Sequence, residues 1–336
     1  MSCGYSIIPF LCNIVAKCKT FPTFVPQVIK NSNTMAGNNR YDVIIVGGSY
    51  AGLSAAMSLG RSLRKVLIID SGLPCNRQTP HSHNFITHDG ETPKAIADKA
   101  REQVLKYETV SIQQGIAVSA IKVENGFELT TADGTVLTAR KLLFATGVKD
   151  LMPAIPGFAE CWGITVIHCP YCHGYEVKQQ KTGIMSNGDM GFDFSKLIAN
   201  LTTDLTLFTN GQSTLSLEQQ QKLQKHNIAV VETEIAGFEH SNGQLKQVLL
   251  KDGSTMPLKA MYAKPSFVQH CDIPVHLGCA LTEQGYLAVD MLGRTSVPGV
   301  YAAGDNTAMM RAVSLAVAGG GMAGAGINKE LVEESF

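Results

Sequence analysis

The sequence has no excess of charge of either sign. Its 336 residues include 28 Lys and Arg against 28 Asp and Glu, which gives a formal net charge of zero. Non-specific binding to nucleic acid or to anionic lipid depends on an excess of positive charge. The sequence therefore predicts neither a nucleic-acid-binding protein nor a membrane-surface protein.

Long hydrophobic runs are missing as well. A helix that spans a bilayer needs about 20 consecutive apolar residues, whereas the longest candidate, 7–16, is interrupted by Pro9 and Asn13. With 45% apolar residues and 32 glycines, the composition is that of a folded globular chain with many tight turns. We expect no association with membranes, and a length that suits two domains.

The cysteines do not form the framework of a secreted disulfide-rich protein. They number nine, which is odd, and they are scattered, with one close pair in the part expected to fold. Secreted frameworks use even numbers of cysteines at regular spacings. We therefore expect a cytoplasmic protein.

Residues 1–40 contain no Asp or Glu and carry Lys17, Lys19, Lys30 and Arg40. Targeting peptides are basic and poor in acids, but the apolar run here is short and the arginine content is low. The alternatives are a disordered extension and an upstream start with Met35 as the natural initiator. We treat 1–40 as an extension outside the fold.

A change of pattern follows at Tyr41. The branched apolar run 43–46 is typical of a buried parallel strand. The glycine-rich turn GGSYAG comes next, then a helix-like segment, 53–63, and a second apolar strand, 66–69. This order predicts a βαβ unit.

The turn has the residue types that a dinucleotide needs. Gly47 permits a sharp turn, the small Ser49 lets the backbone approach a pyrophosphate, and Gly52 lets helix and strand pack closely. Asp70, at the end of the second strand, can accept hydrogen bonds from a ribose diol. The unit therefore predicts a site for a dinucleotide with a free 2′-hydroxyl, against the alternative of a glycine-rich turn that binds nothing.

Three further segments have residues that are typical of a ligand-binding or redox site. The strand at 141–147 ends in Thr-Gly and the strand at 299–305 ends in Gly-Asp. Small residues at the carboxyl ends of strands border the ligand in doubly wound sheets. Between these strands lies the pair Cys169-Pro-Tyr-Cys172.

Taken in order, the GGSYAG turn, the FATG strand end, the CPYC pair and the VYAAGD strand resemble the low-molecular-weight thioredoxin reductase family of flavin disulfide oxidoreductases. The resemblance runs from about Tyr41 to the C-terminus. It implies an α/β fold of two Rossmann-like dinucleotide-binding domains, the second inserted into the first. The FAD-binding domain would comprise 41–155 and 266–336, and the inserted NAD(P)-type domain, 156–265, would carry the Cys pair. It also implies a homodimer.

The resemblance implies a set of FAD-binding positions. The first turn and Asp70 would hold the adenosine and pyrophosphate, Asn84 would contact the flavin, and Asp305 would be an FAD ligand rather than a catalytic acid. Ala312 departs from the Arg-Gln-Ala run of the family, so that one side-chain contact is lost. The full set is Gly47, Gly48, Ser49, Tyr50, Ala51, Gly52, Asp70, Asn84, Thr146, Gly147, Gly304, Asp305, Arg311, Ala312 and Val313.

The Cys pair has the spacing of a reversible disulfide. At the start of a helix one thiol is stabilised as a thiolate while the second resolves mixed disulfides. The resemblance implies that Cys172 faces the flavin and that Cys169 attacks the outside substrate. His173 stands where the reductases usually have Asp, and His168 precedes the pair. Either imidazole can exchange protons near neutral pH.

Other interpretations of the pair remain open. Cys169, Cys172 and His173 satisfy the haem-attachment pattern, but a c-type haem requires export and an apolar pocket. Zinc could use Cys161 with His168 and the pair, but no second Cys-x-x-Cys completes the usual set. The pair could also be inert core cysteines.

The remaining cysteines and histidines are assigned no chemistry. Cys75, Cys271 and Cys279 have no partner by spacing, and we interpret them as structural. The cluster of His81, His83 and His88 has no acid or Cys partner by spacing, so surface or hydrogen-bonding roles are expected. We predict no metal.

The inserted domain has an incomplete dinucleotide fingerprint. Strand 182–185 is followed by Ser186 in place of the first glycine, and strand 204–208 ends in Thr209-Asn210-Gly211. NADPH-dependent members place a cluster of arginines there, and no acid is present to hold a free 2′-hydroxyl. Binding of NADPH or NADH is therefore doubtful.

Three functions follow from these patterns. The first is an FAD-dependent thiol-disulfide oxidoreductase that exchanges electrons between the flavin and a Cys169/Cys172 disulfide, with a small dithiol or disulfide or a thioredoxin-like protein as partner. The second is an oxygen-dependent dithiol oxidase of the same superfamily. The third is a non-enzymatic, flavin-bound redox sensor.

Overall fold

The structure is a computed structural model that describes residues 40–336. The expectations for residues 1–39 (extension, targeting peptide or upstream start) lie outside the described residues. Arg40 begins the first strand. No helix within 40–336 is both long enough and apolar enough to cross a membrane.

The largest sheet has seven strands in the order β3-β2-β1-β6-β5-β4, and β17 also pairs with β6. β1 pairs in parallel with β2 and β6, whereas β4, β5 and the first half of β6 form an antiparallel meander. The strands are β1 (Arg40–Val46), β2 (Val66–Asp70), β3 (Val110–Gln114), β4 (Ala117–Val123), β5 (Gly126–Thr131), β6 (Val136–Phe144) and β17 (Val300–Ala302).

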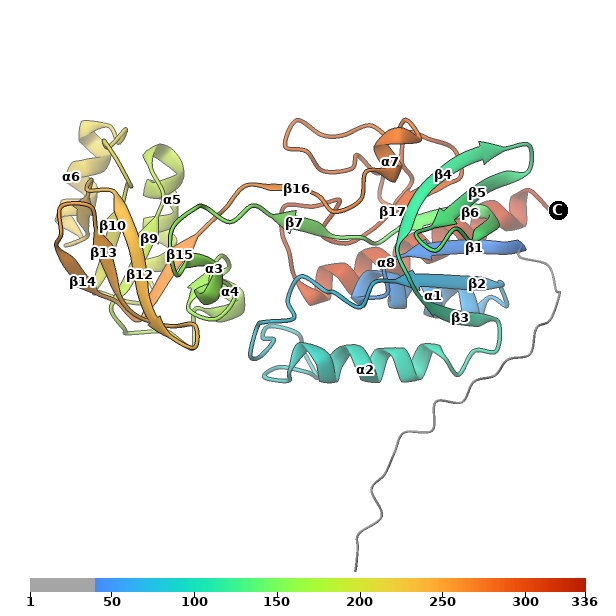
Figure 1. Cartoon of the computed structure of the whole chain (residues 1–336), viewed down its shortest axis with the longest axis horizontal. Coiled ribbons are helices and arrows are strands. Elements are labelled where there is room, and N and C mark those ends of the chain that lie inside the picture. The colour runs from blue at the N-terminus through green and yellow to red at the C-terminus, as the bar shows by residue number, and fades with distance from the viewer. Residues whose placement is uncertain (1–39) are drawn as a thin grey trace, which may run out of the picture. The chain divides into compact units, whose positions relative to one another are not determined.

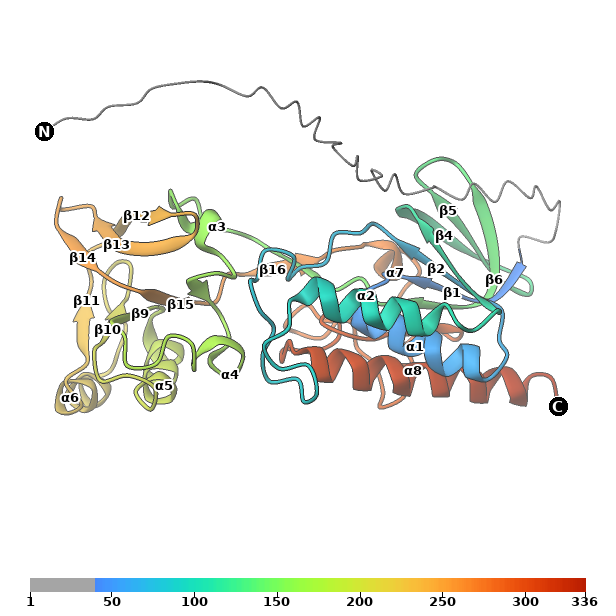
Figure 2. The same cartoon turned by 90° about the horizontal axis from the view of Figure 1, so that it is seen from below.

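Three helices cover one face of this sheet, namely α1 (Tyr50–Arg61), α2 (Pro93–Val104) and α8 (Val313–Glu333) (Figure 2). Alternation along β1 decides which face each side chain joins. Val43 and Ile45 pack with the helices, and Ile44 and Val46 pack on the opposite face. α1 and α8 lie unusually close, since a Cβ on Gly320 would meet the carbonyl oxygen of Ala51 at 2.1 Å.

A second parallel sheet is formed by residues between β7 (Val148–Asp150) and β16 (Phe267–Gln269). Its strand order is β11-β10-β9-β15-β8, and the antiparallel sheet β12-β13-β14 accompanies it (Figure 1). Its strands are β8 (Val166–Ile167), β9 (Thr182–Met185), β10 (Leu205–Phe208), β11 (Ala229–Val231) and β15 (Ala260–Ala263), followed in the antiparallel sheet by β12 (Ile235–Ser241), β13 (Gln244–Leu250) and β14 (Thr255–Pro257). The helices of this part are α3 (Phe158–Cys161), α4 (Pro170–His173), α5 (Gly188–Ile198) and α6 (Leu217–Lys225).

The chain passes between the two parallel sheets twice. It leaves the first along β7 (Val148–Asp150) and returns along β16 (Phe267–Gln269), and these two strands pair antiparallel. The return leads through the short helix α7 (Ile273–His276) to β17 and α8. Two parallel sheets with helices, one interrupting the other in the sequence, confirm the predicted α/β fold class.

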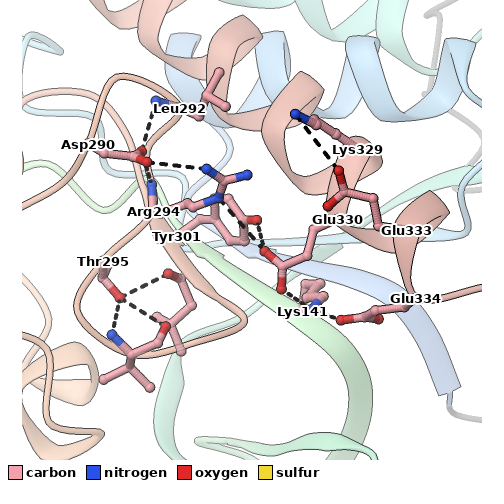
Figure 3. A network of polar contacts seen from close by, with 12 residues as sticks. Lys141, Asp290, Leu292, Arg294, Thr295, Tyr301, Lys329, Glu330, Glu333 and Glu334 are labelled. Carbon is pink, nitrogen blue, oxygen red and sulfur yellow. Dashed lines mark hydrogen bonds and ion pairs between the residues drawn. The ribbon is translucent and has the colours of Figure 1, made fainter.

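A buried ion-pair network fixes the C-terminal part of α8 to the first sheet (Figure 3). Lys141 of β6 is 5% exposed and its ammonium group contacts the carboxylates of Glu330 and Glu334. Glu330 also accepts a hydrogen bond from the buried hydroxyl of Tyr301 in β17. One helix is thereby held to two strands that are more than 150 residues apart in the sequence.

We expect Glu330→Ala to lower the free energy of unfolding by about 2–4 kcal/mol, because it leaves the buried Lys141 with one partly exposed partner. Urea denaturation followed by circular dichroism measures this. Glu333→Ala is the control, since Glu333 is exposed and pairs only with Lys329 on the same helix, and such pairs contribute little. Equal stabilities of the two variants would refute the importance of the network.

Candidate functional site

The first predicted turn adopts a conformation that only small residues allow. Gly47 has φ +107°, and a Cβ on Gly52 would lie 1.9 Å from the carbonyl oxygen of Gly47. Ser49 occupies the N-cap of α1, but its hydroxyl makes no capping hydrogen bond. The first amides of a 12-residue helix are thus left for another acceptor, as a phosphate group requires.

Asp70 lies beside this turn, at the end of β2. Its Oδ1 accepts a hydrogen bond from the amide of Gly48 at 3.1 Å, and its Oδ2 lies 2.9 Å from Nη2 of Arg101. Each carboxylate oxygen can accept two hydrogen bonds, so both oxygens retain capacity for ribose hydroxyls. Sequence reasoning missed Arg101, because nothing in the local pattern of α2 distinguishes it from the other basic residues there.

The strand ends predicted to border the cofactor lie next to each other. β6 and β17 pair in parallel, which places Thr146-Gly147 and Gly304-Asp305 at the same edge of the sheet. Asn306, which the sequence analysis also missed, is fully buried there. Its amide nitrogen donates to the carbonyl oxygen of Phe144, but its Oδ1 has no partner. A buried oxygen without a partner is costly, and it suits a hydroxyl or N–H donor of a bound group.

A second ion pair lies at this edge. Arg311 Nη1 is 2.6 Å from Oδ1 of Asp150, with both side chains largely buried, and the guanidinium lies 5.3 Å from the ring centre of Phe267. Burial raises the pKa of the nearby Asp305 carboxyl, and the positive charge of Arg311 opposes that shift. Arg311 was predicted to lie against the flavin. Its salt bridge to Asp150 could not be read from the sequence.

Cys75, which the sequence analysis interprets as structural, lies near Asp305. It is exposed, and its thiol points to Oδ2 of Asp305 at 3.8 Å. Desolvation, and after it the Asp305 carboxylate, raises the pKa of this thiol to about 12. Cys75 is therefore a protonated, unreactive thiol at the edge of the predicted cofactor site.

The other predicted contact positions occupy loops and helix starts. Asn84 lies exposed in the loop after β2, with φ 59°, and its amide donates to Asp89. Tyr50 and Ala51 are buried in the first turn of α1. Ala312 is the N-cap of α8 and Val313 its first residue.

The Cys pair forms a disulfide at the start of α4. Cys169 is the N-cap, Cys172 lies in the single turn that follows, and their Cα atoms are 5.3 Å apart. The amide of Cys172 donates to Sγ of Cys169 at 3.2 Å. A hydrogen bond from an amide to sulfur is a contact that stabilises a thiolate in general.

Two histidines flank the pair and differ in their surroundings. Burial, and after it the charge of Arg311, lowers the pKa of His168 to about 4. Its Nε2 is buried without a hydrogen-bond partner, so His168 is neutral near pH 7. Burial also lowers the pKa of His173, but the carboxylate of Glu176 opposes this shift.

The second predicted turn is closed by the chain itself. Oδ1 of Asn187 accepts hydrogen bonds from the amides of Gly188 at 2.8 Å and Thr214 at 2.9 Å, and its amide nitrogen donates to the carbonyl oxygen of Gln212. The first amide of α5 is thus engaged by a side chain. At the end of β10, the hydroxyl of Thr209 donates to the carbonyl oxygen of Gly211, and Oδ1 of Asn210 accepts from the amide of Ile235 at the start of β12. These residues do not fit the 2′-phosphate of NADPH.

The comparisons with known proteins agree with this geometry. Residues 41–323 match the pyridine nucleotide-disulphide oxidoreductase family. The chain belongs to this family. Thioredoxin reductase aclD of Aspergillus oryzae is 31% identical over 303 residues, which cover 87% of this chain and 96% of that protein.

Solved structures extend the match to the fold. A putative thioredoxin reductase TrxB from Bacillus anthracis superimposes with a TM-score of 0.84 at 33% identity, covering 88% of this chain and 100% of that chain. An oxidoreductase from Agrobacterium tumefaciens gives 0.82 at 35% identity, covering 87% and 99%. The chain is a thioredoxin reductase-like flavin oxidoreductase with two dinucleotide-binding domains, which confirms the predicted family and fold.

FAD fits the first site, which offers a helix terminus without a side-chain cap, a ribose acceptor in Asp70 and the unpartnered oxygen of Asn306. We expect the purified protein to show the two-band absorption of a flavin. Asp70→Ala should weaken FAD binding about tenfold or more, because it removes charged hydrogen bonds worth about 1.5–3 kcal/mol each. Equilibrium dialysis of the deflavinated protein measures this.

Asp98→Ala is the matched control, because Asp98 lies on the outside of α2 and pairs only with Lys94. If the protein is colourless and cannot be reconstituted with FAD, the assignment of the first site is wrong.

Proposed function

We propose that this protein is an FAD-dependent thiol-disulfide oxidoreductase whose redox-active disulfide is Cys169–Cys172. The observation that carries the proposal is the bridged pair itself, placed at the start of α4 between two histidines whose pKa values are both lowered by burial. When bound, FAD supplies a two-electron acceptor or donor for the pair. Gly47–Gly52, Asp70, Thr146-Gly147 and Gly304-Asp305 would hold it.

The exchange step follows from the chemistry of the pair. In the reduced state, the Cys169 thiolate attacks one sulfur of a substrate disulfide and releases the first substrate thiolate. Cys172 then attacks Sγ of Cys169, releases the second thiolate and restores the bridge. The pair is oxidised and the substrate is reduced to two thiols. The reverse sequence closes a disulfide in a dithiol substrate.

Each direction moves two protons, and the histidines can carry them. His168 is neutral near pH 7, so it can accept a proton from a thiol. His173 directly follows Cys172 and titrates under the opposing influences of burial and Glu176. We assign both as the acid-base residues of the exchange.

We infer the same domain division as the sequence predicts, with FAD on 41–155 and 266–336 and the Cys pair on 156–265. The substrate is a small dithiol or disulfide or a thioredoxin-like protein. Two exposed aromatic side chains stand beside the pair to receive it, Tyr171 at 64% and Tyr175 at 71% exposure.

The closed second turn favours a second candidate function, an oxygen-dependent dithiol oxidase. In such an enzyme electrons enter from a substrate dithiol, so no nicotinamide site is needed. The engagement of the α5 amide by Asn187 supports this candidate over a reductase that depends on NADPH.

The cysteine assignment predicts unequal variants. Cys169→Ser and Cys172→Ser should each lower disulfide exchange by at least about a hundredfold, because the bridge cannot re-form. Cys169→Ser should also perturb the flavin spectrum, since Cys172 is left as a free thiol. Cys271→Ser is the control, because Cys271 is an unbridged, partly exposed cysteine. Full turnover in either variant of the pair contradicts the assignment.

The second turn predicts weak use of NADPH. Loss of charged contacts to a 2′-phosphate should weaken binding about ten- to a hundredfold per contact. We expect slow flavin reduction by NADPH or NADH under anaerobic titration, and faster reduction by a dithiol followed by reoxidation when oxygen is admitted. Rapid, saturable bleaching of the flavin by micromolar NADPH would contradict this prediction and would indicate an NADPH-dependent reductase.

The outer face of α8 supports a homodimer. Leu315 and Met322, which lie two turns apart on the helix, are 44% and 38% exposed. Leu315→Asp with Met322→Asp should convert a particle of twice 36.1 kDa to a monomer in light scattering, because buried charges oppose association. Leu217→Asp, at a 77% exposed position on α6, should leave the mass unchanged. A monomeric wild-type protein would contradict the dimer.

A further inference from the structure

One of the three histidines between β2 and α2 makes contacts that the other two do not. Nδ1 of His83 lies 3.6 Å from Asp89 Oδ1, and Nε2 lies 3.5 Å from Glu176 Oε1. The His83 side chain is 21% exposed. His81 and His88 contact only groups of their own loop. His83 therefore connects this loop to the segment that carries the Cys pair.

Glu176 follows His173 by three residues, in the turn residues that come after α4. Its side chain is 39% exposed. Two neighbouring groups change the pKa of His173 in opposite directions. The carboxylate of Glu176 raises the pKa of His173, and His83 lowers it. Burial, the largest influence, lowers it as well.

We propose that His83 and Glu176 are positioning residues for thiol-disulfide exchange, which together set the protonation of His173 beside Cys172. This inference rests on the proposed function of the pair. The contact of His83 with Glu176 places an imidazole next to a carboxylate. Because the two groups are close, each changes how strongly the other affects His173 electrostatically. The sequence predicts a surface or hydrogen-bonding role for His83, and this proposal gives such a role a function in the reaction.

The surrounding groups define the sign of each effect. Asp89, Glu176 and His81 contact His83, and the charges of Glu176, His83 and His168 act on His173. Glu176→Gln removes the one carboxylate that favours protonated His173. His83→Gln removes a group that competes for that carboxylate. The two variants should therefore shift the protonation of His173 in opposite directions, which simple damage to the fold would not produce.

The test follows a single exchange. Protein reduced with dithiothreitol and freed of it reacts with a chromogenic aromatic disulfide, which yields the protein disulfide and two aromatic thiols. The rate is measured from pH 5 to pH 9. We expect Glu176→Gln to move the limb of the profile that reports His173 to lower pH by about half a unit or more, and His83→Gln to move it to higher pH. His88→Gln, a matched change in the same loop, should follow the wild type.

The outcomes separate the inference from the proposed function. Profiles of the Glu176 and His83 variants that coincide with the wild type, or that move in the same direction, overturn the inference while exchange by the wild type upholds the proposed function. A wild-type protein that does not exchange, or a Cys172→Ser variant that exchanges normally, overturns both. If His83→Gln does not fold in circular dichroism, the isosteric Glu176→Gln decides the case alone.

Discussion

The site at the edge of the first sheet depends on how closely the backbone of α1 approaches the glycine-rich turn after β1 and the helix α8. A side chain at position 52 would strike the carbonyl oxygen of Gly47, and one at position 320 would strike that of Ala51. Because both are glycines, α1 is held between the turn and α8. This brings the C-terminal segment, with Asp305 and Asn306, to the same sheet edge as the turn. Two segments that begin more than 250 residues apart thus build one site.

The sequence predicted the core of this arrangement well and its edges less well. The apolar runs 43–46 and 182–185 became β1 and β9, because a parallel strand buried on both faces leaves a local signal. The strand expected at 141–147 instead spans Val136–Phe144. Its first half pairs antiparallel with β5. Pairing with a neighbouring strand stabilises these residues, and the apolar pattern of the strand itself does not indicate that pairing.

Polar partners were the part of the site that no local pattern could predict. Asp70 pairs with Arg101 and Arg311 with Asp150, over separations of 31 and 161 residues. Such pairs form because a buried charge must find an opposite charge once the fold has closed. The contact of Cys75 with Asp305 is also long-range, and nothing in the local sequence around a lone cysteine indicates it.

The same long-range charges give the two histidines beside the Cys pair different chemistry. Burial, and after it the charge of Arg311, keeps the His168 imidazole neutral near pH 7. The carboxylate of Glu176 favours protonated His173 but acts against the larger effect of burial. Burial is nevertheless the larger influence, so the pKa of His173 is lowered as well and both imidazoles are neutral near pH 7. A neutral imidazole can accept a proton from a thiol and then return it to a thiolate. The proposed exchange can therefore use either histidine, and the charge of Glu176 favours the protonated intermediate at His173 alone.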